Sequence, residues 1–182
     1  MNLKRKKILV SSFIIFLMIT SVAGFIFAPE DNNNQEKKVY KNIEFVRDEN
    51  NRWLVNNRNQ ITITVSPTNL KEQNIINIDE LNSAEKIYLS LNPSQNLNRI
   101  LLELNSLLPL LKPKIVSSCY VDLSECNTLP IKTCKDATNL NKVILINLDN
   151  RTNINYNNNC LEIKGDEKDI ITFLDNLIVS LL

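Results

Sequence analysis

The sequence predicts an α/β protein in which an N-terminal transmembrane helix precedes one domain built on a mixed β-sheet. Three observations support this prediction. Residues 8–28 form an uncharged apolar run directly after a basic flank. Residues 39–65 show the two-residue alternation that is typical of antiparallel strands. The remaining chain alternates strand patterns with helical stripes of leucine and isoleucine, as α/β domains do.

The apolar run of residues 8–28 is long enough to cross a bilayer, since a helix of this length spans about 31 Å. The basic flank, residues 1–7, is expected to stay cytoplasmic by the positive-inside rule, which places the rest of the chain outside. The alternative is a signal peptide cleaved after Ala23. Under the anchor hypothesis the protein is a single-pass cell-membrane protein. Residues 29–38 then form a polar stalk, and residues 39–182 form the extracytoplasmic domain.

Composition excludes several classes of function. Of the 21 basic residues, the four at residues 4–7 belong to the flank, which leaves 17 against 20 acidic residues in the exported part. With no basic surface left there, we expect no nucleic-acid partner. The chain has no histidine, which removes His-based acid–base catalysis and most catalytic zinc sites. No pattern indicates a cofactor, a metal ligand set or a catalytic residue, so the composition favours a non-enzymatic domain.

The first part of the domain is predicted to be a three-stranded antiparallel meander that includes residues 39–46, 53–55 and 61–65. A short helix is assigned to residues 68–77. Asparagine and proline at residues 92–93 suit the start of a second helix. Asp166 suits the N-cap of the last helix.

The C-terminal half follows the order strand, helix, strand, long connection, two strands and helix. The first two strands are expected to be parallel, because a helix joins them. Residues 150–159 are interpreted as a polar turn, and the last two strands as an antiparallel pair. The four strands are predicted at residues 85–91, 114–119, 142–148 and 160–163.

The four cysteines are predicted to form two disulfides, because an even number in an exported domain favours pairing and no C-x-x-C motif occurs. If the strand that begins at Cys160 returns from the edge where Cys119 lies, Cys119 pairs with Cys160 and Cys126 with Cys134. The alternative is pairing in sequence order, Cys119 with Cys126 and Cys134 with Cys160. The same edge, at the carboxyl ends of the parallel strands, is where open α/β sheets bind ligands.

One modification site is also indicated. Asn150 opens an Asn-Arg-Thr sequence, the acceptor pattern for N-glycosylation, in a predicted surface turn.

Two resemblances follow from these residues. The order of elements in the C-terminal half is similar to that of thioredoxin-like folds, although the catalytic dithiol is missing and no redox role is implied. The spacing of Cys119, Cys126, the Leu-Pro-Ile sequence at residues 129–131, Cys134 and Cys160 ahead of Gly165 resembles that of uncharacterised single-pass membrane proteins of small AT-rich archaeal genomes. This second resemblance implies a location and no activity.

Three functions are therefore open. The first is a membrane-anchored extracytoplasmic module that binds a protein partner at the cell surface, or that serves a structural role, stabilised by its disulfides. The second is an extracytoplasmic thiol–disulfide enzyme that uses the Cys119–Cys160 region. The third is a subunit of a cell-envelope complex that uses the anchor, residues 8–28, as its interface.

Overall fold

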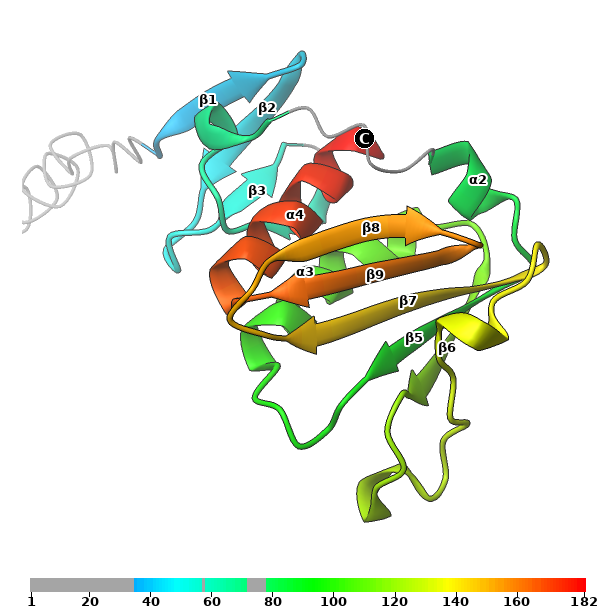
Figure 1. Ribbon diagram of the computed structural model, residues 1–182. Helices are drawn as coiled ribbons and strands as arrows, with labels where there is room; N and C mark the ends of the chain where they lie inside the picture. The colour runs from blue at the N-terminus through cyan, green and yellow to red at the C-terminus, as the bar shows by residue number, and fades with distance from the viewer. Residues whose placement is uncertain (1–34, 57, 72–77) are drawn as a thin grey trace, which may run out of the picture. The chain divides into compact units, whose positions relative to one another are not determined.

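Two β-sheets and two main helices make up the part of the chain that the computed structural model describes, which is residues 35–56, 58–71 and 78–182 (Figure 1). The side chains of residues 58–60 are not described either. Within these ranges no helix is both long enough and apolar enough to cross a bilayer. The predicted anchor, residues 8–28, lies outside the described residues, so it stays a prediction.

The first sheet is antiparallel, with four strands in sequence order. The predicted three-stranded meander is therefore wrong in its first strand, which divides at Lys41 and Asn42. These two residues have φ angles of 50° and 64°, the conformation of a type I′ hairpin turn, in which asparagine is favoured. The strands are β1 (Lys37–Tyr40), β2 (Ile43–Arg47), β3 (Trp53–Val55) and β4 (Arg58–Ile63).

The second sheet is mixed, and its strand order is β6-β5-β7-β9-β8. β6, β5, β7 and β9 run parallel to one another, and β8 runs antiparallel to β9. The mixed α/β fold class is thus confirmed for the described part of the chain. The strands are β5 (Lys86–Leu91), β6 (Lys114–Cys119), β7 (Asn141–Leu148), β8 (Asn153–Asn157) and β9 (Cys160–Gly165).

β8 lies where the sequence predicted a polar turn, at residues 150–159. Ile154 and Tyr156 alternate with asparagines, and both pack against the main core. A second turn with positive φ angles, at Asn158 and Asn159, leads back into β9. Because β8 takes the antiparallel position, β9 runs parallel to β7, and the predicted antiparallel pairing of these two strands is wrong.

Both main helices, α3 (Asn98–Leu107) and α4 (Glu167–Ser180), pack against one face of the five-stranded sheet (Figure 1). The four-stranded sheet contributes to the same core. Burying each large apolar side chain contributes about 1.5–3 kcal/mol, so this layer dominates stability. Its largest fully buried side chains are Phe45, Ile63, Leu81, Ile87, Ile100, Leu104, Leu107, Ile144, Ile146, Leu161 and Ile163.

The helix starts were predicted with mixed success. Asp166 caps α4 as expected, since its Oδ1 accepts the Asp169 N–H at 2.8 Å. α3 begins five residues later than predicted, because Asn92 forms a turn instead, accepting the Ser94 N–H at 3.0 Å.

The helix predicted at residues 68–77 falls partly outside the described residues. Its described start forms only a short 3₁₀ turn, η1 (Pro67–Asn69). α2 (Ile78–Asn82) begins after it.

Candidate functional site

Neither α3 nor α4 covers the second face of the five-stranded sheet. Part of it is covered by the connection between β6 and β7, which contains two 3₁₀ turns, η3 (Ser124–Cys126) and η4 (Cys134–Asp136). Two disulfides fasten this connection, Cys119–Cys126 and Cys134–Cys160. All four cysteines of the chain are therefore paired, in sequence order.

The predicted pairs Cys119–Cys160 and Cys126–Cys134 are wrong because the direction of β9 was wrong. Cys119 ends β6, whereas Cys160 begins β9, three strands away across the sheet. Neighbouring strands lie about 4.8 Å apart, so the two Cα atoms are separated by at least about 14 Å. A disulfide bridges Cα atoms only up to about 7 Å apart.

Three of the four cysteines are poorly accessible for thiol–disulfide exchange. Cys119, Cys126 and Cys160 are each only 2% exposed, whereas Cys134 is half-buried, and thiol exchange requires access to a sulfur atom. Cys160 lies among Val143 and Leu145 of β7, under Cys134 and Ala137 of the connection. The Cys134–Cys160 disulfide therefore fixes a loop over the apolar part of this face.

Toward the carboxyl ends of the strands, the same face becomes polar. The strand register places Asn147 of β7 beside Lys164 of β9, which lies beside Asn153 of β8. Tyr120 and Gln95 approach from neighbouring connections and bond to Asn147. We call Gln95, Tyr120, Asn147, Glu162 and Lys164 the polar cluster.

Hydrogen bonds fix the orientation of the amide groups in the polar cluster. Gln95 Nε2 donates to the Leu148 carbonyl at 3.1 Å, and the Leu148 N–H donates to Gln95 Oε1 at 3.1 Å. These two bonds with Leu148 identify Nε2 as the NH₂ nitrogen of Gln95. Because Nε2 can only donate, the atom of Asn147 that lies 2.9 Å from it must be the acceptor oxygen Oδ1. Tyr120 donates its hydroxyl to the same oxygen at 2.8 Å. The side chain of Asn147 is thus held with its NH₂ group as a positioned donor.

Tyr120 and Lys164 of the polar cluster keep their ordinary charge states at neutral pH, because the pKa of each is raised. Burial raises the pKa of Tyr120, so its hydroxyl stays protonated and donates. The hydrogen bond that Lys164 donates to Glu162 raises the pKa of Lys164, whose Nζ lies 2.9 Å from Glu162 Oε1. The cluster therefore presents neutral donors and one ion pair, and it holds no activated nucleophile.

A shallow cavity of about 440 Å³ opens at the same carboxyl edge of the sheet, on the side of the helices, between the β7–β8 turn and the start of α4. Its apolar wall is Leu148, and Asp149, Asp166 and Glu167 supply its carboxylates; Glu167 Oε1 also lies 3.2 Å from Arg99 Nε. Asp149 Oδ1 accepts the Arg151 N–H at 3.1 Å. The lining residues are Leu148, Asp149, Asn150, Asp166 and Glu167.

Asn150, the predicted glycosylation site, lies in the turn at this cavity and is exposed. Thr152, the third residue of the acceptor sequence, donates its hydroxyl to Asp169 of α4. Occupancy of Asn150 stays a prediction.

At the opposite, amino edge of the sheet, a buried lysine joins α2 to β7. Lys142 is 2% exposed, and its Nζ lies 3.0 Å from the Tyr156 hydroxyl and 3.6 Å from Glu80 Oε1. Burial and the neighbouring Glu80 raise the pKa of Tyr156, so this hydroxyl stays protonated and donates to Glu80. These contacts hold the short helix in place.

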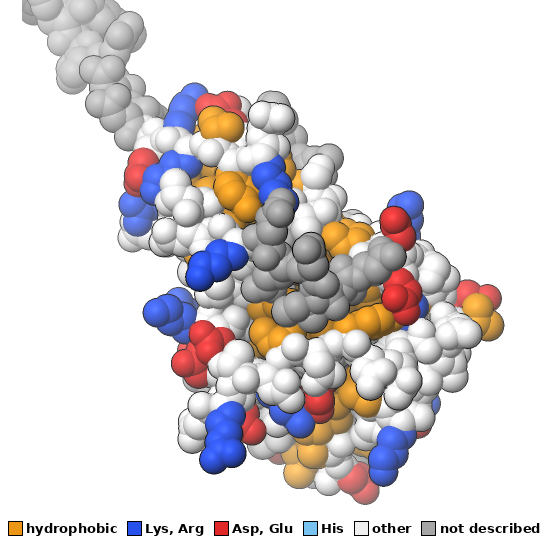
Figure 2. Space-filling view, turned by 45° about the horizontal axis from the view of Figure 1, so that its top comes forward, with side chains coloured by type: hydrophobic (Ala, Val, Ile, Leu, Met, Phe, Trp, Pro, Cys, Tyr) orange, Lys and Arg blue, Asp and Glu red, His pale blue; other side chains and the backbone are white. Residues whose placement is uncertain are grey.

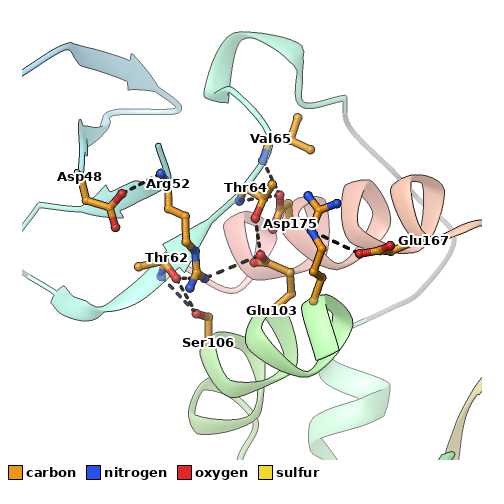
Figure 3. Close-up of polar contacts among 10 residues, drawn as sticks. Asp48, Arg52, Thr62, Thr64, Val65, Glu103, Ser106, Glu167 and Asp175 are labelled. Carbon is orange, nitrogen blue, oxygen red and sulfur yellow. Dashed lines mark hydrogen bonds and ion pairs between the residues drawn. The ribbon is translucent and has the colours of Figure 1, made fainter. Parts of the chain in front are cut away.

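A second buried polar network connects the four-stranded sheet to α3 and α4 (Figure 3). Asp175 of α4 accepts the backbone N–H groups of Thr64 and Val65, at 3.0 Å and 2.7 Å. Glu103 of α3 accepts the Thr64 hydroxyl and lies 3.6 Å from Arg52. Neither acidic residue was selected from the sequence.

Charges on the molecular surface are mixed in sign. On the face drawn in Figure 2, basic and acidic side chains alternate with neutral and apolar ones. Among the residues that the structure describes, no group of three or more potential metal ligands occurs. Comparison with protein-family models, with curated proteins and with solved structures finds no match to this chain.

Proposed function

We propose that this chain is a single-pass membrane protein whose extracytoplasmic domain binds a basic segment of another cell-surface protein and catalyses no reaction. The cavity between the β7–β8 turn and the start of α4 is the observation that carries the proposal. Its wall is the apolar Leu148, and Asp149, Asp166 and Glu167 supply carboxylates around it. A lysine or arginine side chain fits this combination, since it has an apolar stem and a charged end.

The positioned amide of Asn147 adds a second kind of recognition. An extended peptide carries backbone carbonyls as well as side chains, and a peptide that continues across the carboxyl edge of the sheet meets the NH₂ donor of Asn147, which precedes Leu148 and points to the opposite face. Because Gln95 and Tyr120 already hold this amide, binding costs little side-chain entropy. The two disulfides support the extracytoplasmic location, because disulfides persist in oxidising compartments.

The binding test titrates the full chain, in mild detergent, with a peptide of alternating lysine and serine. We expect the amide NMR signals of Asn147 and Asp149 to shift, with an affinity that falls as salt is added. The double variant Asp149→Asn with Glu167→Gln should bind about fivefold more weakly, since two exposed ion pairs contribute about 1 kcal/mol together. Both substitutions keep the size of the original side chains and one of their two acceptor oxygens.

Two controls make the test decisive. Glu85→Gln removes one negative charge at the opposite edge of the sheet, where Glu85 is exposed, and it should leave the affinity unchanged. A peptide of alternating glutamate and serine should not bind. Equal losses in both variants, or no loss in the double variant, would contradict the proposed site.

The location is tested separately with protease added to intact cells that express the full chain. We expect residues 35–182 to be digested while the cytoplasmic contents stay intact. Protection of this region would contradict the extracytoplasmic location without affecting the peptide result. The envelope-complex hypothesis stays untested, and it is compatible with either outcome of the peptide titration.

A further inference from the structure

The network of Figure 3 contains two buried acids on different helices. Asp175 of α4 is 0% exposed and Glu103 of α3 is 1% exposed. One oxygen of each is well satisfied. Asp175 Oδ2 accepts two backbone N–H groups just after β4, and Glu103 Oε1 accepts the Thr64 hydroxyl.

The other oxygen of each acid has no partner. Asp175 Oδ1 and Glu103 Oε2 are both fully buried, and no donor in the described part of the chain reaches either atom. A buried oxygen without a donor is costly, and two neighbouring carboxylates cannot both stay ionised in a site of low dielectric. A single proton between the two oxygens removes both costs, because it gives each oxygen a hydrogen-bond partner and leaves one negative charge.

The charged groups around the pair match one negative charge. Arg52, just before β3, is the nearest described cation, with its Nη2 3.6 Å from Glu103 Oε1. On α3, Arg99 pairs instead with Glu167 of α4 at 3.2 Å, in an exposed ion pair. Past β4, Thr64 and Val65 contribute only uncharged donors. One arginine therefore balances one carboxylate.

We propose that Asp175 and Glu103 share one proton through their otherwise unpartnered oxygens, and that this proton holds the β4 end of the four-stranded sheet on α3 and α4. Three elements meet at the proton, and loss of it places two negative charges beside a single arginine. The contact of the β4 end with α3 and α4 therefore depends on this proton. It is stable at neutral and acidic pH and is weakened under alkaline conditions.

The sign of the pH effect follows from linkage. Burial, and then the charge of Glu103, raises the pKa of Asp175 from its ordinary value of 3.8 to about 9. Between these two values the folded state binds one proton more than the unfolded state does. The unfolding equilibrium constant therefore rises up to tenfold for each pH unit in that interval, and the domain becomes more stable as the pH falls.

The composition of the chain makes this effect measurable. The protein contains no histidine, so from about pH 5 to pH 8 the α-amino group is its only other group whose ordinary pKa lies in the interval. The exposed acids with lowered pKa values, Glu36, Glu44, Glu125 and Asp136, act below this interval.

The test measures urea unfolding of the full chain in mild detergent from about pH 5 to pH 8. The wild type should show an unfolding constant that rises close to tenfold per pH unit. Asp175→Asn should abolish this slope while the protein stays folded, because the amide keeps the acceptor for Thr64 and Val65 and replaces the proton with an N–H donor. Asp122→Asn, in an exposed loop, is the matched control and should keep the wild-type slope.

A second measurement does not depend on any variant folding. The infrared spectrum of the folded wild type at neutral pH should contain the C=O stretch of one protonated carboxyl group. This band should disappear on unfolding. Absence of the band, or a wild-type slope equal to that of Asp175→Asn, would overturn the shared proton.

Discussion

Ile144 and Leu145 are neighbours on β7, yet they belong to two layers that are held in different ways. Ile144 points into the core beneath α3 and α4, where it is 0% exposed. Leu145 points to the opposite face and is 7% exposed among Val143 and Cys160. Helices cover the first face through apolar contact, whereas a loop fastened by the Cys134–Cys160 disulfide covers the second. A sheet that has helices on one face only can thus shield its other face with a covalent link.

The largest expected effect is on the helix-covered face. Ile144→Ala removes buried methylene and methyl groups where packing is tight on all sides. We expect the free energy of unfolding to fall by about 4 kcal/mol. Urea unfolding monitored by the fluorescence of Trp53 measures it, and a loss below about 1 kcal/mol would contradict the assignment of this face as the main core.

The next effect concerns the Cys134–Cys160 disulfide, which fastens the loop over the second face of the sheet. Replacing Cys134 and Cys160 with serine opens a loop whose ends are separated by 26 residues. Loop-closure entropy predicts a loss of about 3.5 kcal/mol. The matched pair, Cys119→Ser with Cys126→Ser, opens a separation of only 7 residues, for which the same relation predicts about 2.4 kcal/mol. The reverse order would show that loop length does not govern the two disulfides.

A smaller effect is expected at Leu145, which depends on the cover. In the wild type, Leu145→Ala should cost about 2 kcal/mol, since part of its environment is loop. In the protein that lacks the Cys134–Cys160 disulfide, the same substitution should cost much less, because the loop no longer excludes water. This non-additivity, measured with a double-mutant cycle, is specific to the loop-covered face. Ile144→Ala should show the same cost in both backgrounds.

The smallest effect lies at the polar end of the loop-covered face. Tyr120→Phe deletes the hydroxyl that donates to Asn147 Oδ1, and it should cost about 1 kcal/mol. Gln95 still orients the amide, so weak binding of the lysine–serine peptide should persist. Complete loss of peptide binding would mean that Tyr120 itself contacts the partner.

The sequence predicted elements well where apolar side chains determine them. β6 matches its predicted bounds of residues 114–119, and β5 and β7 each differ by one residue at the start. β8 was missed because three of its five residues are asparagine, a residue that strands usually avoid. The alternation of Ile154 and Tyr156 was the available signal. This one omission reversed β9 and led to the wrong cysteine pairs.

The candidate site was less accessible to sequence reasoning. The carboxyl edge was expected to be the binding edge, but the roles of Gln95 and Asn147 depend on contacts 52 residues apart in the chain. The buried acids offered a clearer signal. Glu103 and Asp175 fall on the apolar stripes of their helices, among leucines and isoleucines that are themselves buried. An acid in such a position needs a partner, and only the fold identifies it.

The order of the disulfides bears on how the domain is made. Each cysteine pairs with its neighbour along the chain, Cys119 with Cys126 and Cys134 with Cys160. Under the topology that we propose, residues 39–182 leave the membrane from their N-terminal end, so the first pair is outside before the third cysteine emerges. An oxidase that links cysteines in their order of appearance would then produce the native set directly, without disulfide shuffling by an isomerase.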